Sequence, residues 1–286
     1  MAMIQNEPSK TRSPHQLTRG TSLWIYLSIA AALIAIVGSV VGLTARPIYS
    51  GITAVFLPQA LAQDVANLAV ASPSMLILAA MALRSSIRAY LLWLGVVTFT
   101  IYNYVIYTFS IPFGPLFLLW VGVLGLCLYA LIGGVTALDH DAVQARFVRR
   151  RPLQVVGWFL IITAVFFGFL WLSEDVPALL AGRMPQSVTD MALPTNPVHV
   201  LDLAFFLPAV IATGVLLLRG KPLAHTVAPS MIVFLVLTGV PILLTPVVQA
   251  MRGQAAAWGV VVPIGTLTLA LIALLTWLMS SIRTDE

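Results

Sequence analysis

Long, uninterrupted runs of apolar residues separated by short polar segments dominate this chain of 286 residues. A helix needs roughly 20 apolar residues to cross the hydrocarbon core of a bilayer. Eight runs reach about that length, and none alternates between apolar and polar residues as the strands of a membrane barrel do. The pattern therefore predicts eight transmembrane helices, at residues 23–43, 65–83, 89–110, 115–138, 153–172, 198–218, 224–250 and 255–280.

The predicted fold is an all-α, polytopic transmembrane helix bundle. We expect a basic, disordered tail at 1–22, a transmembrane domain at 23–280 and a second tail at 281–286. The first apolar run is longer than the core of a secretory signal, and no small-residue cleavage site follows it, so it is predicted to remain as a span. We find no internal repeat in the sequence, which leaves an inverted-repeat transporter without support.

Composition supports a lipid environment. Sixty per cent of the residues are hydrophobic and 9% are charged, whereas a soluble domain carries about 25% charged residues. The mean hydropathy is +0.99. The net charge of +5 lies in short loops between apolar runs, which is typical of topology determinants and predicts no nucleic-acid partner.

Basic residues predict the orientation. With both termini cytoplasmic, the outer loops hold three of the 15 Lys and Arg residues, namely Arg46, Arg183 and Arg252. The inner segments hold the other twelve: Lys10, Arg12, Arg19, Arg84, Arg88, Arg146, Arg149, Arg150, Arg151, Arg219, Lys221 and Arg283. Lys and Arg accumulate in cytoplasmic loops, so we expect a multi-pass protein of the cytoplasmic (cell inner) membrane with both ends inside.

Several polar residues lie in the outer halves of predicted spans two, three and six: Asp64, Asn67, Asn103, Tyr104, Tyr107, His199 and Asp202. Ionisable groups in a span are costly and are functional candidates by default. His199 and Asp202 share a helix face because three residues advance about 300°. Gathering the polar groups would let them satisfy one another, so we hypothesise one outward-opening pocket for a small molecule or ion. Alternatively, Asp64 caps its helix, and Asp202 caps or pairs at the interface.

Prolines interrupt predicted spans two, six, seven and eight, at Pro73, Pro208, Pro229, Pro241, Pro246 and Pro263. Each removes a backbone hydrogen bond, and the resulting kink is compatible with either a hinge or an inert bundle. Gly38 and Gly42 form a GxxxG motif, which favours close helix packing.

Other chemistries lack the residues that they need. The lysines, Lys10 and Lys221, lie outside the predicted spans, which excludes a retinal Schiff base. Cys127 is the single cysteine, so the chain forms no internal disulfide. Phosphate-binding, nucleophile-elbow and HExxH motifs are missing, and no cofactor is evident.

At Tyr102–Asn103–Tyr104 and Val200–Leu201–Asp202–Leu203 the chain resembles a family of uncharacterised multi-pass bacterial membrane proteins. The resemblance covers most of residues 60–250. It implies a bacterial origin and this topology, and it implies no activity.

Three functions therefore stay open. The first is a small-solute transporter or permease-like binder that uses the outward pocket. The second is a membrane enzyme at the outer leaflet, with Asp64, His199 and Asp202 as acid, base or metal ligands. The third is a non-catalytic membrane partner or sensor. The substrate and the oligomeric state do not follow from the sequence.

Overall fold

The computed structural model describes residues 20–283, which form helices and turns apart from one isolated β-bridge between Phe147 and Ile282. The α-helices are α2 Ser22–Thr44, α3 Leu57–Ala66, α4 Ser72–Leu83, α5 Ile87–Ser110, α6 Phe117–Thr136, α7 His140–Gln144, α8 Arg150–Leu180, α9 Gln186–Met191, α10 Pro197–Leu201, α11 Leu207–Leu218, α12 Pro222–Met251 and α13 Val261–Ser280. Two π-helices, η2 Asn67–Ala71 and η3 Asp202–Phe206, and two 3-10 helices, η1 Arg46–Tyr49 and η4 Trp258–Val260, complete the set.

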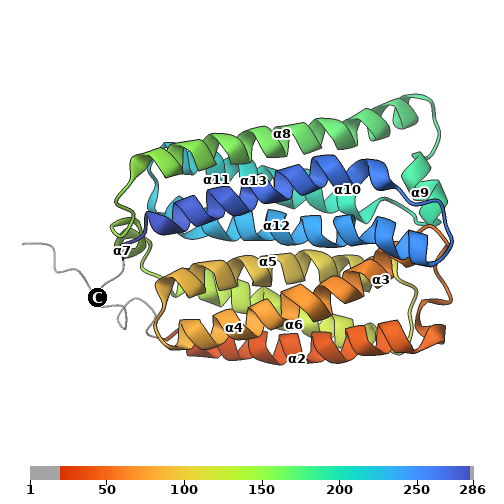
Figure 1. The fold of residues 1–286 in the computed structure, drawn as a ribbon, viewed down its shortest axis with the longest axis horizontal. Helices are drawn as coiled ribbons and strands as arrows, with labels where there is room; N and C mark the ends of the chain where they lie inside the picture. Colours follow the sequence, from red (N-terminus) through yellow and green to blue (C-terminus); the bar gives the residue numbers. More distant parts are fainter. Residues whose placement is uncertain (1–19, 284–286) are drawn as a thin grey trace, which may run out of the picture.

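Eight of the described helical segments are long and apolar enough to cross a membrane. We number them spans one to eight in chain order. Span two runs from α3 through η2 to α4, and span six runs from α10 through η3 to α11. All eight lie along the long axis of the molecule (Figure 1). They indicate an integral, multi-pass membrane protein and confirm the predicted all-α fold with eight candidate spans.

Spans two and five extend furthest beyond their predicted bounds. Span two begins at Leu57 rather than at residue 65, and Pro58 occupies its first turn, where a missing N–H matters least. Helix α8 continues to Leu180 rather than ending at 172. Of the predicted tails, residues 1–19 and 284–286 lie outside the described residues. Ser22 already belongs to α2, and Ser281 and Ile282 are buried.

Both ends of the described chain lie at one end of the bundle, as an even number of spans requires. The Arg283 backbone N–H donates to the Arg146 carbonyl oxygen at 2.9 Å, and Arg88 Nη2 donates to the Ile282 carbonyl oxygen at 2.6 Å. We call this end, with the turns 84–86, 137–149 and 219–221, the terminal side. The far side carries η1, α9 and the 252–257 turn. The cytoplasmic location of the terminal side stays a prediction from the charge distribution.

The bundle consists of two halves. Spans one to four (red to yellow-green) pack together below spans five to eight (green to blue) in the view of Figure 1. Helices α5 and α12 meet between the halves. A Cβ atom at Gly95 would lie 2.5 Å from Val233 Cβ, and Ser230 Oγ donates to the Leu91 carbonyl oxygen at 3.0 Å. The missing side chain of Gly95 therefore allows this close approach.

The two halves repeat one local structure at a constant separation of 135 residues. This separation relates η2 to η3 (202 − 67), α4 to α11 (207 − 72) and the start of α5 to that of α12 (222 − 87). Ser85 and Gly220 both adopt left-handed backbone, with φ of 67° and 64°. The helix ends match as well, because Ser86 N–H donates to the Met81 carbonyl and Lys221 N–H to the Leu216 carbonyl.

Spans two and three are therefore structural counterparts of spans six and seven. The expectation that the chain lacks an internal repeat is wrong at the level of structure. Each counterpart lies four spans further along the chain, an even number, so both halves cross in the same direction. The relation is therefore a parallel repeat and not an inverted one.

Candidate functional site

Asp64 lies inside span two, in the second turn of α3, and is 1% exposed. The residue at the N-terminal cap of α3 is Phe56, so Asp64 is not a helix cap. Because α3 begins as early as Leu57, Asp64 lies within the bundle, at its far-side end. A carboxyl group placed there needs hydrogen-bonding partners to offset its loss of water.

Two tyrosines supply these partners. The Tyr49 hydroxyl donates to Asp64 Oδ2 at 2.6 Å, and the Tyr107 hydroxyl donates to Asp64 Oδ1 at 2.9 Å. The Tyr107 hydroxyl also lies 3.3 Å from the Ala60 carbonyl oxygen, which gives it a second acceptor. No described Lys or Arg forms an ion pair with Asp64. The carboxyl group is thus held by hydrogen bonds without an opposite charge.

Tyr49 comes from η1, outside the spans, and is 4% exposed. Burial, followed by the nearby Asp64 carboxylate, raises the pKa of Tyr49 well above its ordinary value. The phenol therefore stays protonated and acts as a donor toward Asp64.

Amide side chains near Asp64 in span two connect to spans one and three. Asn103 Nδ2 donates to Asn67 Oδ1 at 3.0 Å, and Asn67 Nδ2 donates to Ser39 Oγ at 3.4 Å. Gln63 Nε2 also donates to Asn67 Oδ1, at 3.3 Å. Ser39, Asn67 and Asn103 are all buried. Spans one, two and three therefore meet through polar side chains at the start of π-helix η2.

Small and aromatic residues close this region. A Cβ atom at Gly42 would collide with Asp64 Oδ2 and lie 2.8 Å from the Tyr49 hydroxyl, so only glycine fits there. On the other side, Tyr104 stacks on Tyr107 with ring centres 5.4 Å apart, and Tyr107 packs against Trp120 at the same distance. We call the set Ser39, Tyr49, Asp64, Asn67, Asn103, Tyr104 and Tyr107 the Asp64 network.

His199 and Asp202 have a different set of partners. Trp171 Nε1 donates to Asp202 Oδ2 at 2.9 Å, and His199 Nδ1 lies 2.9 Å from Asp175 Oδ1. The Trp171 and His199 rings stack with centres 4.6 Å apart. His199 Nε2 is 3.9 Å from Glu174 Oε2. Because α8 extends beyond its predicted end, it carries the Glu174 and Asp175 carboxylates next to His199.

Asn196, not Asp202, caps the helix of span six, since its side chain accepts from the Val198 and His199 N–H groups. Asp202 instead begins η3, as Asn67 begins η2. Each of these two side chains hydrogen-bonds to the preceding span, through Ser39 or Trp171. The two polar sites are therefore counterparts in the two halves.

The structure brings together five of the seven predicted residues and places His199 and Asp202 at the second site. Helix α5 contributes residues to both sites from different faces. Asn103 and Tyr107 belong to the Asp64 network, whereas Tyr102 hydrogen-bonds to Asp202 and packs its ring on Phe206. Asp64, His199 and Asp202, the conditional metal ligands, do not form one cluster. The described residues contain no group of three or more His, Cys, Asp or Glu side chains that could hold a metal ion.

Sequence reasoning missed Ser39, Tyr49 and Trp171 as site residues. For Ser39 a signal exists, because it lies three residues before Gly42 on the face that the GxxxG motif assigns to close packing. Tyr49 and Trp171 are spaced as ordinary interfacial aromatics. Nothing in the sequence distinguishes either residue from an ordinary aromatic residue at the membrane interface.

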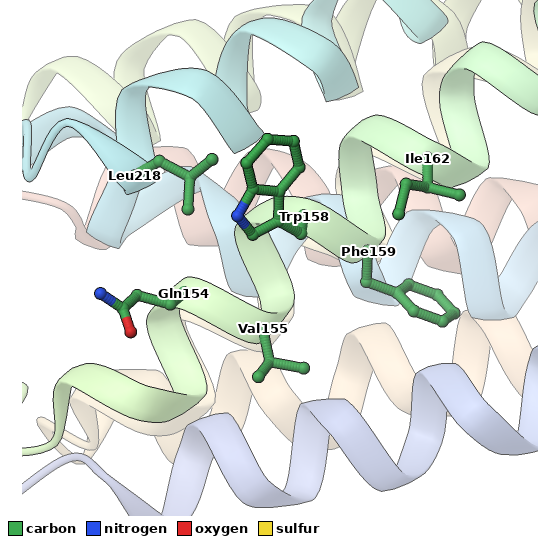
Figure 2. Close-up of a pocket in the computed structure, with 6 residues that line it drawn as sticks. All are labelled: Gln154, Val155, Trp158, Phe159, Ile162 and Leu218. Carbon is green, nitrogen blue, oxygen red and sulfur yellow. The ribbon is translucent and has the colours of Figure 1, made fainter.

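Two cavities lie away from both polar sites. One, of about 540 Å³, is lined by Gln154, Val155, Trp158, Phe159, Ile162 and Leu218 (Figure 2). The other, of about 600 Å³, lies between α8 and α13. Both are apolar grooves on the surface of the bundle. Among the described residues, the one buried side-chain nitrogen or oxygen without a partner is Arg88 Nε, so the Asp64 network is internally satisfied.

Comparisons with protein-family models, curated proteins and solved structures give no match for this chain.

Proposed function

We propose that the protein is a proton-coupled transporter of a small solute, and that Asp64 is its proton-binding group. The observation that carries the proposal is a buried carboxyl group within a span, with a phenol on each oxygen and no described basic residue paired with it. Such a group is strongly stabilised by taking up a positive charge. Intramembrane carboxyl groups commonly act as proton relays for this reason.

A proton fits the network better than a metal cation does. Both carboxylate oxygens already accept hydrogen bonds, and Asn67 Oδ1 accepts two. A metal cation would need several of these oxygens at once. It would have to displace the donors that hold them, whereas a proton adds no volume.

Tyr107 provides a way to accommodate the proton. When Asp64 is ionised, the Tyr107 hydroxyl donates to Asp64 Oδ1. Once that oxygen is protonated, the same hydroxyl accepts from it and turns its own hydrogen toward the Ala60 carbonyl, 3.3 Å away. Every buried polar atom then remains paired in both states, as a low-dielectric site requires.

The repeat supports transport over the alternatives. Spans two and six each contain a π-helix that begins at a site residue, with Pro73 and Pro208 six positions later. π-Helices and prolines are the usual causes of kinks in helices. Transporters built from parallel repeats move their halves relative to each other around a central site. Equivalent hinges, each beside a polar site, suit that motion.

The charge distribution supports an outward-facing site. Tyr49 and Asp64 lie toward the far side, and the terminal side carries most of the basic residues. With the terminal side in the cytoplasm, the proton would reach Asp64 from outside the cell, past Tyr49.

Proton movement in liposomes tests the proposal and does not require the solute to be identified first. Purified protein would be reconstituted with a pH-sensitive dye inside the vesicles. Pools of amino acids, sugars, nucleosides and organic acids would then be added outside. We expect one pool to cause proton movement with the unaltered protein, and Asp64→Asn to reduce the rate at least tenfold.

The matched control is Asp190→Asn, since Asp190 is an exposed far-side aspartate of α9 that accepts from Gln186. This variant should transport normally. Equal proton movement with Asp64→Asn and the unaltered protein would refute the role of Asp64. Solute uptake without proton movement would leave a transporter and refute the coupling.

A further inference from the structure

The two halves of the bundle differ in how their outer helices pack. In the first half, α2 and α6 lie in close contact, and Trp24 fills the space beside Gly133. Their counterparts in the second half, α8 and α13, make few contacts. The groove of about 600 Å³ lies in this opening, with Phe166 on one side and Pro263 on the other.

The groove continues along α8 to the terminal side. The cavity of about 540 Å³, whose lining side chains are drawn in Figure 2, shares Phe159 and Ile162 with the first and reaches along α8 to Gln154. Trp158 and Ile162 are 58% and 63% exposed, although they lie within a span. A large exposed apolar surface at this depth is a binding surface for lipid chains or for another apolar helix.

Basic side chains stand at the terminal-side mouth of the groove. Arg150 and Arg151 precede Gln154 and Val155 by four residues, so each pair shares a helix face. Arg219 directly follows the lining residue Leu218. All three arginines are exposed.

A further contact joins the two basic segments. Gln144 Nε2 donates to the Gly220 carbonyl oxygen at 2.8 Å, which ties the end of α7, where the connection to α8 begins, to the turn after α11. Arg149 and Lys221 belong to these same two segments and are exposed as well. Five exposed cationic side chains thus belong to the two segments that join at the terminal-side end of the groove.

We propose that this groove binds an anionic phospholipid of the leaflet on the terminal side. One acyl chain lies along Val155, Trp158 and Ile162, and the phosphate contacts Arg150, Arg151 and Arg219. Arginine donates two parallel hydrogen bonds to a phosphate, and basic pockets beside spans bind anionic head groups in this way. This inference is independent of the proposed transport function.

The charge pattern favours a lipid over a second copy of the chain. A two-fold dimer through this groove would bring the same patch of each copy together at the same membrane depth. The arginines of both copies would then repel one another. An anionic lipid neutralises them instead.

Native mass spectrometry of the full-length protein tests the proposal. The protein would be titrated with phosphatidylglycerol and, separately, with phosphatidylcholine of the same chains. We expect tighter binding of phosphatidylglycerol, weakened roughly fivefold for each arginine removed in the set Arg150→Gln, Arg151→Gln and Arg219→Gln. Arg183→Gln with Arg252→Gln, on the far side, is the matched control and should bind as the unaltered protein does.

A second variant tests the groove itself while keeping every charge. Val155→Trp fills the groove beside Gln154 and should also weaken the binding of phosphatidylglycerol. Equal binding of both lipids would overturn the proposal, as would a triple arginine variant that binds phosphatidylglycerol normally. A dimer that Val155→Trp dissociates would identify a second copy as the occupant and would also overturn it.

Discussion

Asp64 is accommodated within the bundle by three residues, two that donate hydrogen bonds to it and one that leaves space for it. Tyr49 and Tyr107 donate to its two oxygens, and Gly42 leaves the space that these groups occupy. Hydrogen bonds to a charged acceptor contribute about 1.5–3 kcal/mol each, and an unpaired buried partner costs a similar amount. The stability of the far-side end of span two therefore depends on this arrangement.

Gly42→Ala should destabilise the protein by roughly 1–3 kcal/mol, because the added methyl group separates Asp64 from Tyr49. Thermal unfolding in detergent measures the effect. Gly38→Ala is the matched control, since Gly38 belongs to the same GxxxG motif and a Cβ there meets nothing within 4 Å. A loss of stability as large in Gly38→Ala would show that the effect belongs to helix packing and not to Asp64.

Because of Tyr49, the free energy of unfolding should depend on pH in the alkaline range. Its folded-state pKa is raised, so the hydrogen bond from its phenol contributes fully below the unfolded value of about 10 and is lost as pH rises toward the folded value. Tyr49→Phe should therefore be less stable than the unaltered protein at neutral pH, and the difference should shrink above pH 10. Denaturation midpoints from pH 7 to 11 test this. A difference that stays constant over that range would contradict the assignment.

At the scale of single elements, spans two and six are the unusual ones. Each changes from α- to π-helix at a residue of a polar site, and the N–H groups of Ser72 and Leu207 close these π-turns on Asn67 and Asp202. Proline six positions after the start of each π-helix prevents the regular α-helical hydrogen bond there. The two spans thus have the same π-helix and the same proline at the same register.

Pro73→Ala and Pro208→Ala should each slow transport and leave stability unchanged or slightly raised, because alanine restores a backbone donor and stiffens the helix. Comparable effects are expected, since the two hinges are counterparts. Proton movement in liposomes and thermal unfolding measure them. Pro58→Ala is the control, because Pro58 lies in the first turn of α3. If only one of the two proline variants slowed transport, spans two and six would not act as equivalent hinges.

Sequence patterns predicted the elements better than the contacts. Apolar runs specify the spans, since lipid requires about 20 apolar residues per crossing. The far-side extension of span two was missed, because residues 57–64 include Gln59, Gln63 and Asp64 and interrupt the apolar run. The role of Tyr49 depends on how a loop folds back over span two. No local pattern encodes such a contact.

At the scale of the whole molecule, the repeat was invisible because few residues are shared between the halves. Pro73 and Arg84 recur as Pro208 and Arg219, but Asn67 is replaced by Asp202 and Ser85 by Gly220. Apolar residues substitute for one another freely in lipid, so the backbone geometry persists while identity is lost. The two halves match in the positions of their π-helices, in their left-handed turns and in the hydrogen bonds at their helix ends.

Topology in the cell is a prediction for the molecule as a whole. In a Cys127→Ala background, an impermeant thiol reagent added to intact cells should label Thr189→Cys on α9 and should not label Ala145→Cys beside α7. Both positions are exposed, and they lie on opposite sides of the bundle. Labelling of Ala145→Cys alone would invert the orientation, and labelling of both would contradict the eight-span membrane topology.

Proton uptake by Asp64 itself is the central claim, and difference infrared spectroscopy measures it directly. Lowering the pH of the reconstituted protein should produce the carbonyl band of a protonated carboxylic acid. Other carboxyl groups, Asp202 among them, contribute bands of their own, so one component of this absorption should be missing in Asp64→Asn and retained in Asp190→Asn. A band that persists unchanged in Asp64→Asn would show that another carboxyl group takes up the proton, and would contradict the account.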